Sequence, residues 1–122
     1  MLITYESLTG NVRRFVTKLK KFHNVEVKEI HEGLEVNEPF VHITYTVGFG
    51  QVPPKTSKFI ENNKKYLKGV VSSGNRNWGE FFGAAGDKLS SLYNVPLLLK
   101  IELSGTPTDI ERFMQEVEKI DK

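Results

Sequence analysis

The stretch best suited to chemistry lies near the start of the chain and comprises Ser7, Leu8, Thr9, Gly10 and Asn11. It follows an apolar run and precedes a helical pattern. The first N–H groups of a helix have no partner within the helix, and the helix dipole makes their surroundings positive. Hydroxyl and amide side chains add hydrogen-bond donors, and a glycine lets the backbone approach an anion closely. The sequence therefore predicts a phosphate site at this turn.

The phosphate predicted at this turn is a terminal monoester. The turn holds no lysine, so it is not the loop that binds metal-bound nucleoside triphosphates, which needs a Gly-Lys-Ser/Thr sequence. A hydroxyl-lined turn without lysine suits a group such as the phosphate of flavin mononucleotide (FMN). An ordinary helix cap after a buried strand is the alternative interpretation.

The order of predicted elements indicates the fold that positions this turn. Strand-like segments cover residues 2–6, 25–30, 40–46, 67–73 and 97–103, and helical patterns cover residues 11–21, 55–66, 79–92 and 107–120. Alternating strands and helices imply an α/β fold of three layers, with helices on both faces of a parallel sheet. The second strand alternates polar and apolar residues, as an edge strand does, whereas the others are nearly continuous runs of apolar or β-branched residues. We expect one domain over residues 1–122 with strand order 2-1-3-4-5.

In a sheet of this order, ligands bind at the carboxyl ends of the first and third strands. The loop after the third strand, residues 46–54, carries Gly48 and Gly50, which permit close approach to a flat ring. Phe49 between them either stacks on that ring or fills the core.

The loop after the fourth strand, residues 72–79, lies beside these two loops in the predicted sheet. It carries Asn75 and Asn77, whose amides can bind the polar edge of a pyrimidine-like ring, and Trp78, which can wall it. The alternative is a structural turn in which both asparagines bond the local backbone and the tryptophan packs on the sheet. The position of the loop at the binding edge favours the ring.

Residue types exclude several kinds of chemistry. The chain has no cysteine, which excludes disulfides, thiolate catalysis and cysteine-held metals. The spacing of the histidines makes no metal pair, and no carboxylate cluster accompanies them. We expect His23 in a solvated linker, His31 beyond an edge strand and His42 inside the third strand as a satisfied core or partly covered histidine. A hydrolytic triad is unsupported. Glu6 is alone after the first strand and Thr46 ends the third, so a phospho-accepting receiver domain is also excluded.

Composition and charge are ordinary for a globular protein, with 39% hydrophobic residues, 26% charged residues and a net charge of +2. No apolar stretch reaches membrane-spanning length, and the small net charge gives no reason to expect nucleic acid binding. The chain begins with a strand-like run instead of a basic leader and a long apolar segment. We therefore expect no secretory signal and a cytoplasmic location.

Three motifs together resemble the NrdI flavodoxins, which are accessory proteins of class Ib ribonucleotide reductase. The motifs are Ser7-x-Thr9-Gly10-Asn11, Thr46-x-Gly48-Phe49-Gly50-x-Val52-Pro53 and Ser73-Gly74-Asn75-Arg76-Asn77-Trp78-Gly79. The similarity continues into residues 94–96 and 102–105, so it covers nearly the whole chain. The third motif is the most specific, because ordinary flavodoxins usually lack it.

The resemblance implies a flavodoxin-like fold that binds one FMN without covalent attachment and without a metal. It places the phosphate on the first loop and the ring between the other two. The cofactor residues assigned in this way are Ser7, Leu8, Thr9, Gly10, Asn11, Val12, Thr46, Val47, Gly48, Phe49, Gly50, Ser73, Gly74, Asn75, Asn77, Trp78 and Gly79. It also implies that the peptide between Gly48 and Phe49 turns over when flavin N5 gains a hydrogen, since glycine tolerates both orientations.

The resemblance also implies a function. The reduced flavin reacts with oxygen and supplies a superoxide-level oxidant to the dimanganese site of the reductase small subunit, which then forms its tyrosyl radical. The expected partners are that subunit, molecular oxygen and an unidentified upstream reductant. The protein is then a redox accessory protein more than a classical turnover enzyme.

Charge offers a physical reason for the reaction with oxygen. Residues 46–80 hold six basic and two acidic residues, and positive charge near the ring favours an anionic reduced flavin. The residues expected to face the reductase subunit are Phe49, Arg76 and Trp78, with Lys55 and Lys58 assisting its approach. Two other interpretations stay open: a general flavodoxin that carries electrons between several partners, and a flavin-free domain that recognises a phosphorylated small molecule.

Overall fold

The computed structural model describes residues 1–121. Five strands form one parallel sheet. The strands are β1 (Leu2–Tyr5), β2 (Glu26–Glu29), β3 (Phe40–Tyr45), β4 (Leu67–Gly74) and β5 (Leu97–Glu102). Their order is β2-β1-β3-β4-β5, and every neighbouring pair is parallel. The α/β class and the strand order predicted from the sequence are therefore confirmed.

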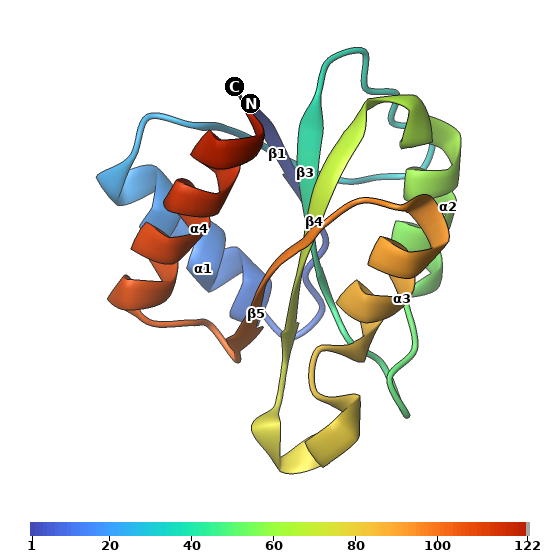
Figure 1. The fold of residues 1–122 in the computed structure, drawn as a ribbon, viewed down its shortest axis with the longest axis vertical. Coiled ribbons are helices and arrows are strands. Elements are labelled where there is room, and N and C mark those ends of the chain that lie inside the picture. The colour runs from blue at the N-terminus through green and yellow to red at the C-terminus, as the bar shows by residue number, and fades with distance from the viewer. Residues whose placement is uncertain (122) are drawn as a thin grey trace.

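Helices cover both faces of the sheet, with α1 and α4 on one face and α2 and α3 on the other (Figure 1). Their bounds are α1 (Asn11–Phe22), α2 (Pro54–Asn63), α3 (Ala84–Tyr93) and α4 (Pro107–Ile120). Two short 3-10 segments, η1 (Lys64–Tyr66) and η2 (Arg76–Phe81), follow α2 and precede α3. The last three residues of the helix predicted over residues 55–66 thus belong to η1.

The helix predicted over residues 79–92 is wrong at its start. Gly79 has φ 57° and ψ −121°, and Gly83 has φ 63°, and neither conformation belongs to a right-handed helix. The two glycines break the helical path and delay α3 to Ala84. The segment that precedes α3 at the carboxyl edge of the sheet is therefore the kinked 3-10 segment η2 and a short turn, not the first part of the α-helix.

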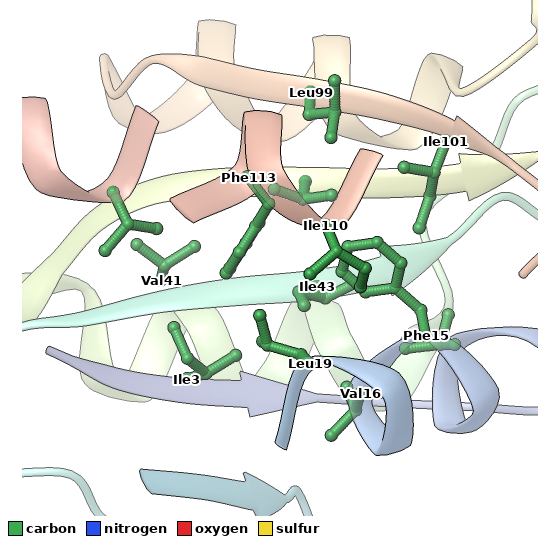
Figure 2. Close-up of a cluster of buried hydrophobic side chains, with 13 residues drawn as sticks. Ile3, Phe15, Val16, Leu19, Val41, Ile43, Leu99, Ile101, Ile110 and Phe113 are labelled. Atoms are coloured by element: carbon green, nitrogen blue, oxygen red, sulfur yellow. The ribbon is translucent and has the colours of Figure 1, made fainter. Parts of the chain in front are cut away.

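Buried side chains hold each pair of helices against the sheet. One cluster joins β1, β3, β4 and β5 to the apolar faces of α1 and α4 (Figure 2). Its aromatic pair, Phe15 and Phe113, meets edge to face with ring centroids 5.7 Å apart. The other cluster joins the sheet to α2 and α3 and contains Phe40 and Phe59, whose ring centroids are 5.5 Å apart. Because Phe15 lies near the start of α1, this packing fixes the N-terminus of α1 at the edge of the sheet.

Candidate functional site

A cleft of about 320 Å³ opens at the carboxyl edge of the sheet, where the loops after β1, β3 and β4 meet. Its size is within the range of roughly 300–1,000 Å³ that is usual for small-molecule sites. The residues that line it are Ser7, Leu8, Thr9, Asn11, Val12, Tyr45, Thr46, Val47, Gly48, Ser73, Gly74, Asn75, Trp78 and Leu103. The structure thus brings together the three loops that the sequence places at this edge.

The turn between β1 and α1 presents free backbone donors at one end of the cleft. Gly10 takes the cap position of α1 with φ 92° and offers no side-chain acceptor to the helix. The Ser7 hydroxyl accepts from the N–H of Arg13 at 3.3 Å, so it acts as an ordinary cap for that one group. The N–H groups of Asn11 and Val12 are the first two of the helix and have no partner within it. They give this end of the cleft an anion-binding character.

The loop after β3 is closed by a pair of backbone hydrogen bonds. The N–H of Val47 donates to the carbonyl of Gln51 at 2.9 Å, and the N–H of Gln51 donates back at 2.7 Å. Gly48, with φ 54°, lies at the start of the tip that this pair encloses. Phe49 at the tip is 79% exposed, so the interpretation that it fills the core is wrong. Its ring points away from the core and meets Phe81 edge to face at 6.0 Å.

The loop after β4 agrees in part with each of its two interpretations, the structural turn and the wall of a ring site. Asn75 accepts from the N–H of Asn77 at 2.9 Å, which is the local turn bond of the structural alternative. Trp78 lines the cleft and is 42% exposed, so it does not pack wholly on the sheet. Arg76 Nε lies 3.4 Å from Glu102 Oε1, and its guanidinium lies over the Phe82 ring at 4.9 Å. Arg76 is therefore held at the side of the cleft by two neighbours.

Five residues assigned to the cofactor from the sequence do not line the cleft, and they are Gly10, Phe49, Gly50, Asn77 and Gly79. The glycines among them shape the loops. A Cβ at Gly50 would lie 2.9 Å from the Cβ of Ala84, so only glycine fits between this loop and the start of α3. Gly79 provides the kink inside η2.

Tyr45 and Leu103 line the cleft, but neither is predicted from the sequence as a site residue. Leu103 has φ 55°, a left-handed conformation that costs a residue with a Cβ about 1 kcal/mol or more. Its carbonyl accepts from the Ser73 hydroxyl at 2.7 Å, and its N–H donates to the Gly74 carbonyl at 2.9 Å. These bonds tie the end of β5 to the loop after β4. The sequence signals for Leu103 are its position at the end of the predicted last strand and its place in the stretch 102–105 that resembles the NrdI flavodoxins.

A buried chain of hydrogen bonds starts at the wall of the cleft. Tyr45 donates to Glu6 Oε2 at 3.2 Å, and Thr56 donates to Glu6 Oε1 at 2.7 Å. His42 Nε2 lies 2.9 Å from the Thr56 hydroxyl, and His42 Nδ1 lies 2.8 Å from the Thr4 hydroxyl. Because the Thr56 hydrogen goes to the carboxylate, Nε2 is the donor and Nδ1 the acceptor. The prediction that His42 is a satisfied core histidine is confirmed.

Burial sets the charge of two members of this chain. It lowers the pKa of His42 to about 3, so the imidazole is neutral at pH 7. Burial, with a further contribution from the neighbouring Glu6 carboxylate, raises the pKa of Tyr45 to about 12. The Tyr45 hydroxyl therefore stays a hydrogen-bond donor, and the cleft wall that it forms is held in one arrangement.

The basic residues counted over residues 46–80 do not all surround the cleft, so the charge argument based on that count is wrong. Lys64 and Lys65 lie in η1, and Lys68 lies at the start of β4. These three lysines are at the amino edge of the sheet, whereas the cleft is at its carboxyl edge. Between residues 46 and 80 the chain runs from the carboxyl edge of the sheet to its amino edge and back. A count of charges along the sequence therefore combines residues that lie at opposite edges.

The other two histidines lie away from the cleft. His23 follows α1 as its C-cap residue and is partly exposed, with Nε2 3.1 Å from Glu111 Oε1 of α4. His31 contacts the carbonyl of its neighbour Glu32 at 3.1 Å. Within residues 1–121, no three His, Asp or Glu side chains are arranged to hold a metal ion. None of the helices described is long and apolar enough to cross a bilayer.

An open parallel sheet of order 2-1-3-4-5, with a cleft over the turn between β1 and α1, defines a flavodoxin-like protein. Two solved flavodoxins share the fold. A short-chain flavodoxin associated with a bacterial microcompartment aligns with a TM-score of 0.73 at 22% identity, covering 98% of this chain and 95% of its own. Flavodoxin 2 from Bacillus cereus aligns with a TM-score of 0.70 at 23% identity, covering 97% of each chain.

The chain belongs to the NrdI flavodoxin-like family, whose family model matches residues 3–115. The SPbeta prophage-derived protein NrdI of Bacillus subtilis is 53% identical over 120 residues, which is 98% of this chain and 93% of the relative. Protein NrdI of Bacillus licheniformis is 51% identical over 118 residues, which is 97% of this chain and 88% of the relative. The family expected from the three loop motifs is therefore confirmed.

Proposed function

We propose that the cleft binds one FMN and that the reduced protein uses oxygen to supply a superoxide-level oxidant to the small subunit of a class Ib ribonucleotide reductase. The observation that carries the proposal is the meeting of the three NrdI-type loops in one cleft. That cleft lies at the edge where sheets of this order bind their ligands. Membership of the NrdI family supports the proposed role with ribonucleotide reductase, and the cleft offers a place for the cofactor.

The lining residues suit FMN at both ends of the cleft. At the α1 end, the N–H groups of Asn11 and Val12 and the Thr9 hydroxyl suit a phosphate. At the other end, Trp78 and Leu103 offer aromatic and apolar surface to a flat ring. No lysine or arginine is among the lining residues. The phosphate would therefore be held by hydrogen bonds and the helix dipole, without a direct ion pair.

Bound FMN would supply the electron transfer to oxygen, and the protein would supply binding, orientation and access. The bonds between Val47 and Gln51 hold both ends of the loop that contains Gly48 and Phe49. The peptide between these two residues is then free to turn while its anchors stay fixed. The Tyr45–Glu6 hydrogen bond stabilises the wall beside that loop.

Exposed apolar side chains around the mouth of the cleft suit contact with a protein partner. Four large side chains form this rim, and they are Leu8, Phe49, Trp78 and Leu103, with exposed fractions of 71%, 79%, 42% and 45%. Apolar groups exposed together mark interaction sites more often than scattered ones do. We therefore expect the reductase subunit to cover this rim, which also brings it to the open edge of the cofactor.

The proposal is tested with the purified flavoprotein and a manganese-loaded reductase small subunit. The expected result is a tyrosyl radical, measured by electron paramagnetic resonance, only when both the reduced protein and oxygen are added. An ordinary flavodoxin at equal flavin concentration is the control, and an equal radical yield from it would favour the general electron carrier. A purified protein that neither contains flavin nor takes up FMN would overturn the cofactor assignment and favour the flavin-free domain.

A further inference from the structure

We propose that Arg14 is a positioning residue that orients the Asn11 side chain, so that the cleft prefers a phosphorylated flavin over an unphosphorylated one. Arg14 does not line the cleft, whereas Asn11 and Thr9 do. Its effect on the ligand therefore passes through Asn11. This inference rests on the proposed function, because it concerns the phosphate end of the proposed FMN site.

The orientation of Asn11 follows from its contact with Arg14. Arg14 Nη2 donates to Asn11 Oδ1 at 2.6 Å. A guanidinium has donors only, so this contact fixes the carboxamide oxygen toward Arg14 and the amide NH₂ group on the other side. Asn11 Nδ2 accordingly lies 3.4 Å from Thr9 Oγ1, at the lining of the cleft.

This orientation decides which groups an incoming phosphate meets. Because the Thr9 oxygen faces the Asn11 amide, the Thr9 hydroxyl hydrogen remains available for donation to an anion. Without Arg14, the Asn11 carboxamide can rotate and present its oxygen, which would repel a phosphate. Riboflavin has no phosphate, so its binding should not depend on this orientation.

Packing on the turn holds Arg14 in place. A Cβ at Gly10 would lie 3.0 Å from Arg14 Nη1, so the guanidinium rests against the open face of that glycine. The N–H of Arg14 also donates to the Gly10 carbonyl at 2.9 Å. The adjacent Arg13 points elsewhere and contacts both carboxylate oxygens of Glu29 on β2 at 2.8 Å. The two arginines therefore place equal charge in one helical turn but only one of them contacts Asn11.

The experiment compares the affinity of the apoprotein for FMN and for riboflavin, measured by quenching of flavin fluorescence. Arg14→Met should weaken FMN binding about tenfold, the scale of one charge-assisted hydrogen bond, and leave riboflavin binding unchanged. Arg14→Gln should retain most of the preference, because its amide can still donate to the Asn11 oxygen. Arg13→Met removes the same charge and should change the FMN to riboflavin ratio less than about threefold.

A double-mutant cycle separates positioning from direct attraction by charge. In an Asn11→Ala protein, Arg14→Met should have no further effect on the ratio, because the group that it orients is absent. A full additional loss in that background, an equal loss in Arg13→Met, or an equal loss of both flavins would overturn the inference. If the unmodified protein binds neither flavin, the proposed function fails first. If it binds FMN and Arg14→Met leaves the ratio unchanged, only this inference fails.

Discussion

Leu103 is a residue whose backbone conformation costs stability and whose side chain lines the cleft. We predict that Leu103→Gly weakens FMN binding about fivefold. The variant loses the apolar contact of this side chain with the ligand, which is worth roughly half the free energy of burying a whole leucine side chain. The free energy of unfolding of the apoprotein should stay within about 1 kcal/mol of the unmodified value, since glycine adopts φ 55° without strain. Flavin titration and thermal unfolding measure the two quantities.

Asn94 offers a matched control for this prediction. It also has φ 55°, but it caps the C-terminus of α3, at the far end of that helix from the cleft. Asn94→Gly should change stability by a similar small amount and leave FMN affinity unchanged. If Leu103→Gly lowers stability and affinity together while Asn94→Gly changes neither, Leu103 supports the fold and not the ligand.

His42 predicts a loss of stability in mild acid. Its pKa is about 3 in the folded protein and about 6.5 in an unfolded chain, so the unfolded state gains a proton first as the pH falls. The stabilisation is complete above about pH 6.5 and is lost progressively toward pH 3. Between pH 6 and 5 the free energy of unfolding should fall by about 1 kcal/mol per pH unit from this group.

Urea unfolding of the unmodified protein and of His42→Gln at pH 7, 6 and 5 measures this contribution. The variant should be less stable at pH 7, because the bonds to Thr4 and Thr56 are disturbed. Its dependence on pH should nevertheless be flatter than that of the unmodified protein. Parallel pH profiles would mean that His42 is not kept neutral by burial.

At the scale of elements, the loop enclosed by Val47 and Gln51 is the part of the site best arranged to move. We predict that Gly48→Ala makes the bound flavin harder to reduce, because a Cβ restricts the orientations of the Gly48–Phe49 peptide. The expected change is roughly 30 mV for each 1.4 kcal/mol lost in a two-electron couple. Redox titration of the flavin absorbance measures it.

Gly33→Ala is the control for an alanine at positive φ. Gly33 has φ 82° with open space around its Cβ position, and it does not line the cleft. Its replacement should leave the reduction potential unchanged. An unaltered potential in Gly48→Ala with FMN bound normally would contradict a redox-linked turn of this peptide.

The strands and their order are predictable because burial on both faces leaves mostly apolar or β-branched residues in β1 and β3 and a short Val70-Val71 pair at the centre of β4. The start of α3 is not predictable from the sequence. The residues after Gly79 are compatible with a helix, and only the backbone angles of Gly79 and Gly83 interrupt the helical path. The place of Leu103 in the cleft is also not predictable from the sequence, and the reason is its backbone conformation. Its positive φ depends on bonds to Ser73 and Gly74 of another strand, which no local pattern contains.

At the scale of the whole molecule, the two edges of the sheet differ in what they expose. The carboxyl edge carries the cleft and its apolar rim, whereas Lys64, Lys65 and Lys68 lie at the amino edge. Lys58 Nζ on α2 lies 3.8 Å from Glu32, so part of its charge is offset by that carboxylate. We therefore expect docking of the reductase subunit to depend more on apolar contact than on the lysines.

Phe49 tests this expectation, because it is the most exposed member of the rim and does not line the cleft. Phe49→Ser should raise the protein concentration needed for half-maximal radical yield about tenfold, as loss of a central aromatic contact does in other interfaces. FMN content and the rate of reaction with oxygen should be retained. The effect should persist at high salt, since apolar contact is not screened by ions.

Phe22→Ser and the double variant Lys55→Glu, Lys58→Glu complete the test. Phe22 is 62% exposed at the end of α1, at the amino edge of the sheet, so its replacement should leave radical yield unchanged. The lysine variant should slow activation at low salt and recover as salt is added, because exposed charges act mainly on the rate of encounter. If Phe49→Ser and Phe22→Ser behave alike while the lysine variant loses activity at every salt concentration, the reductase subunit docks on the α2 face instead of the rim.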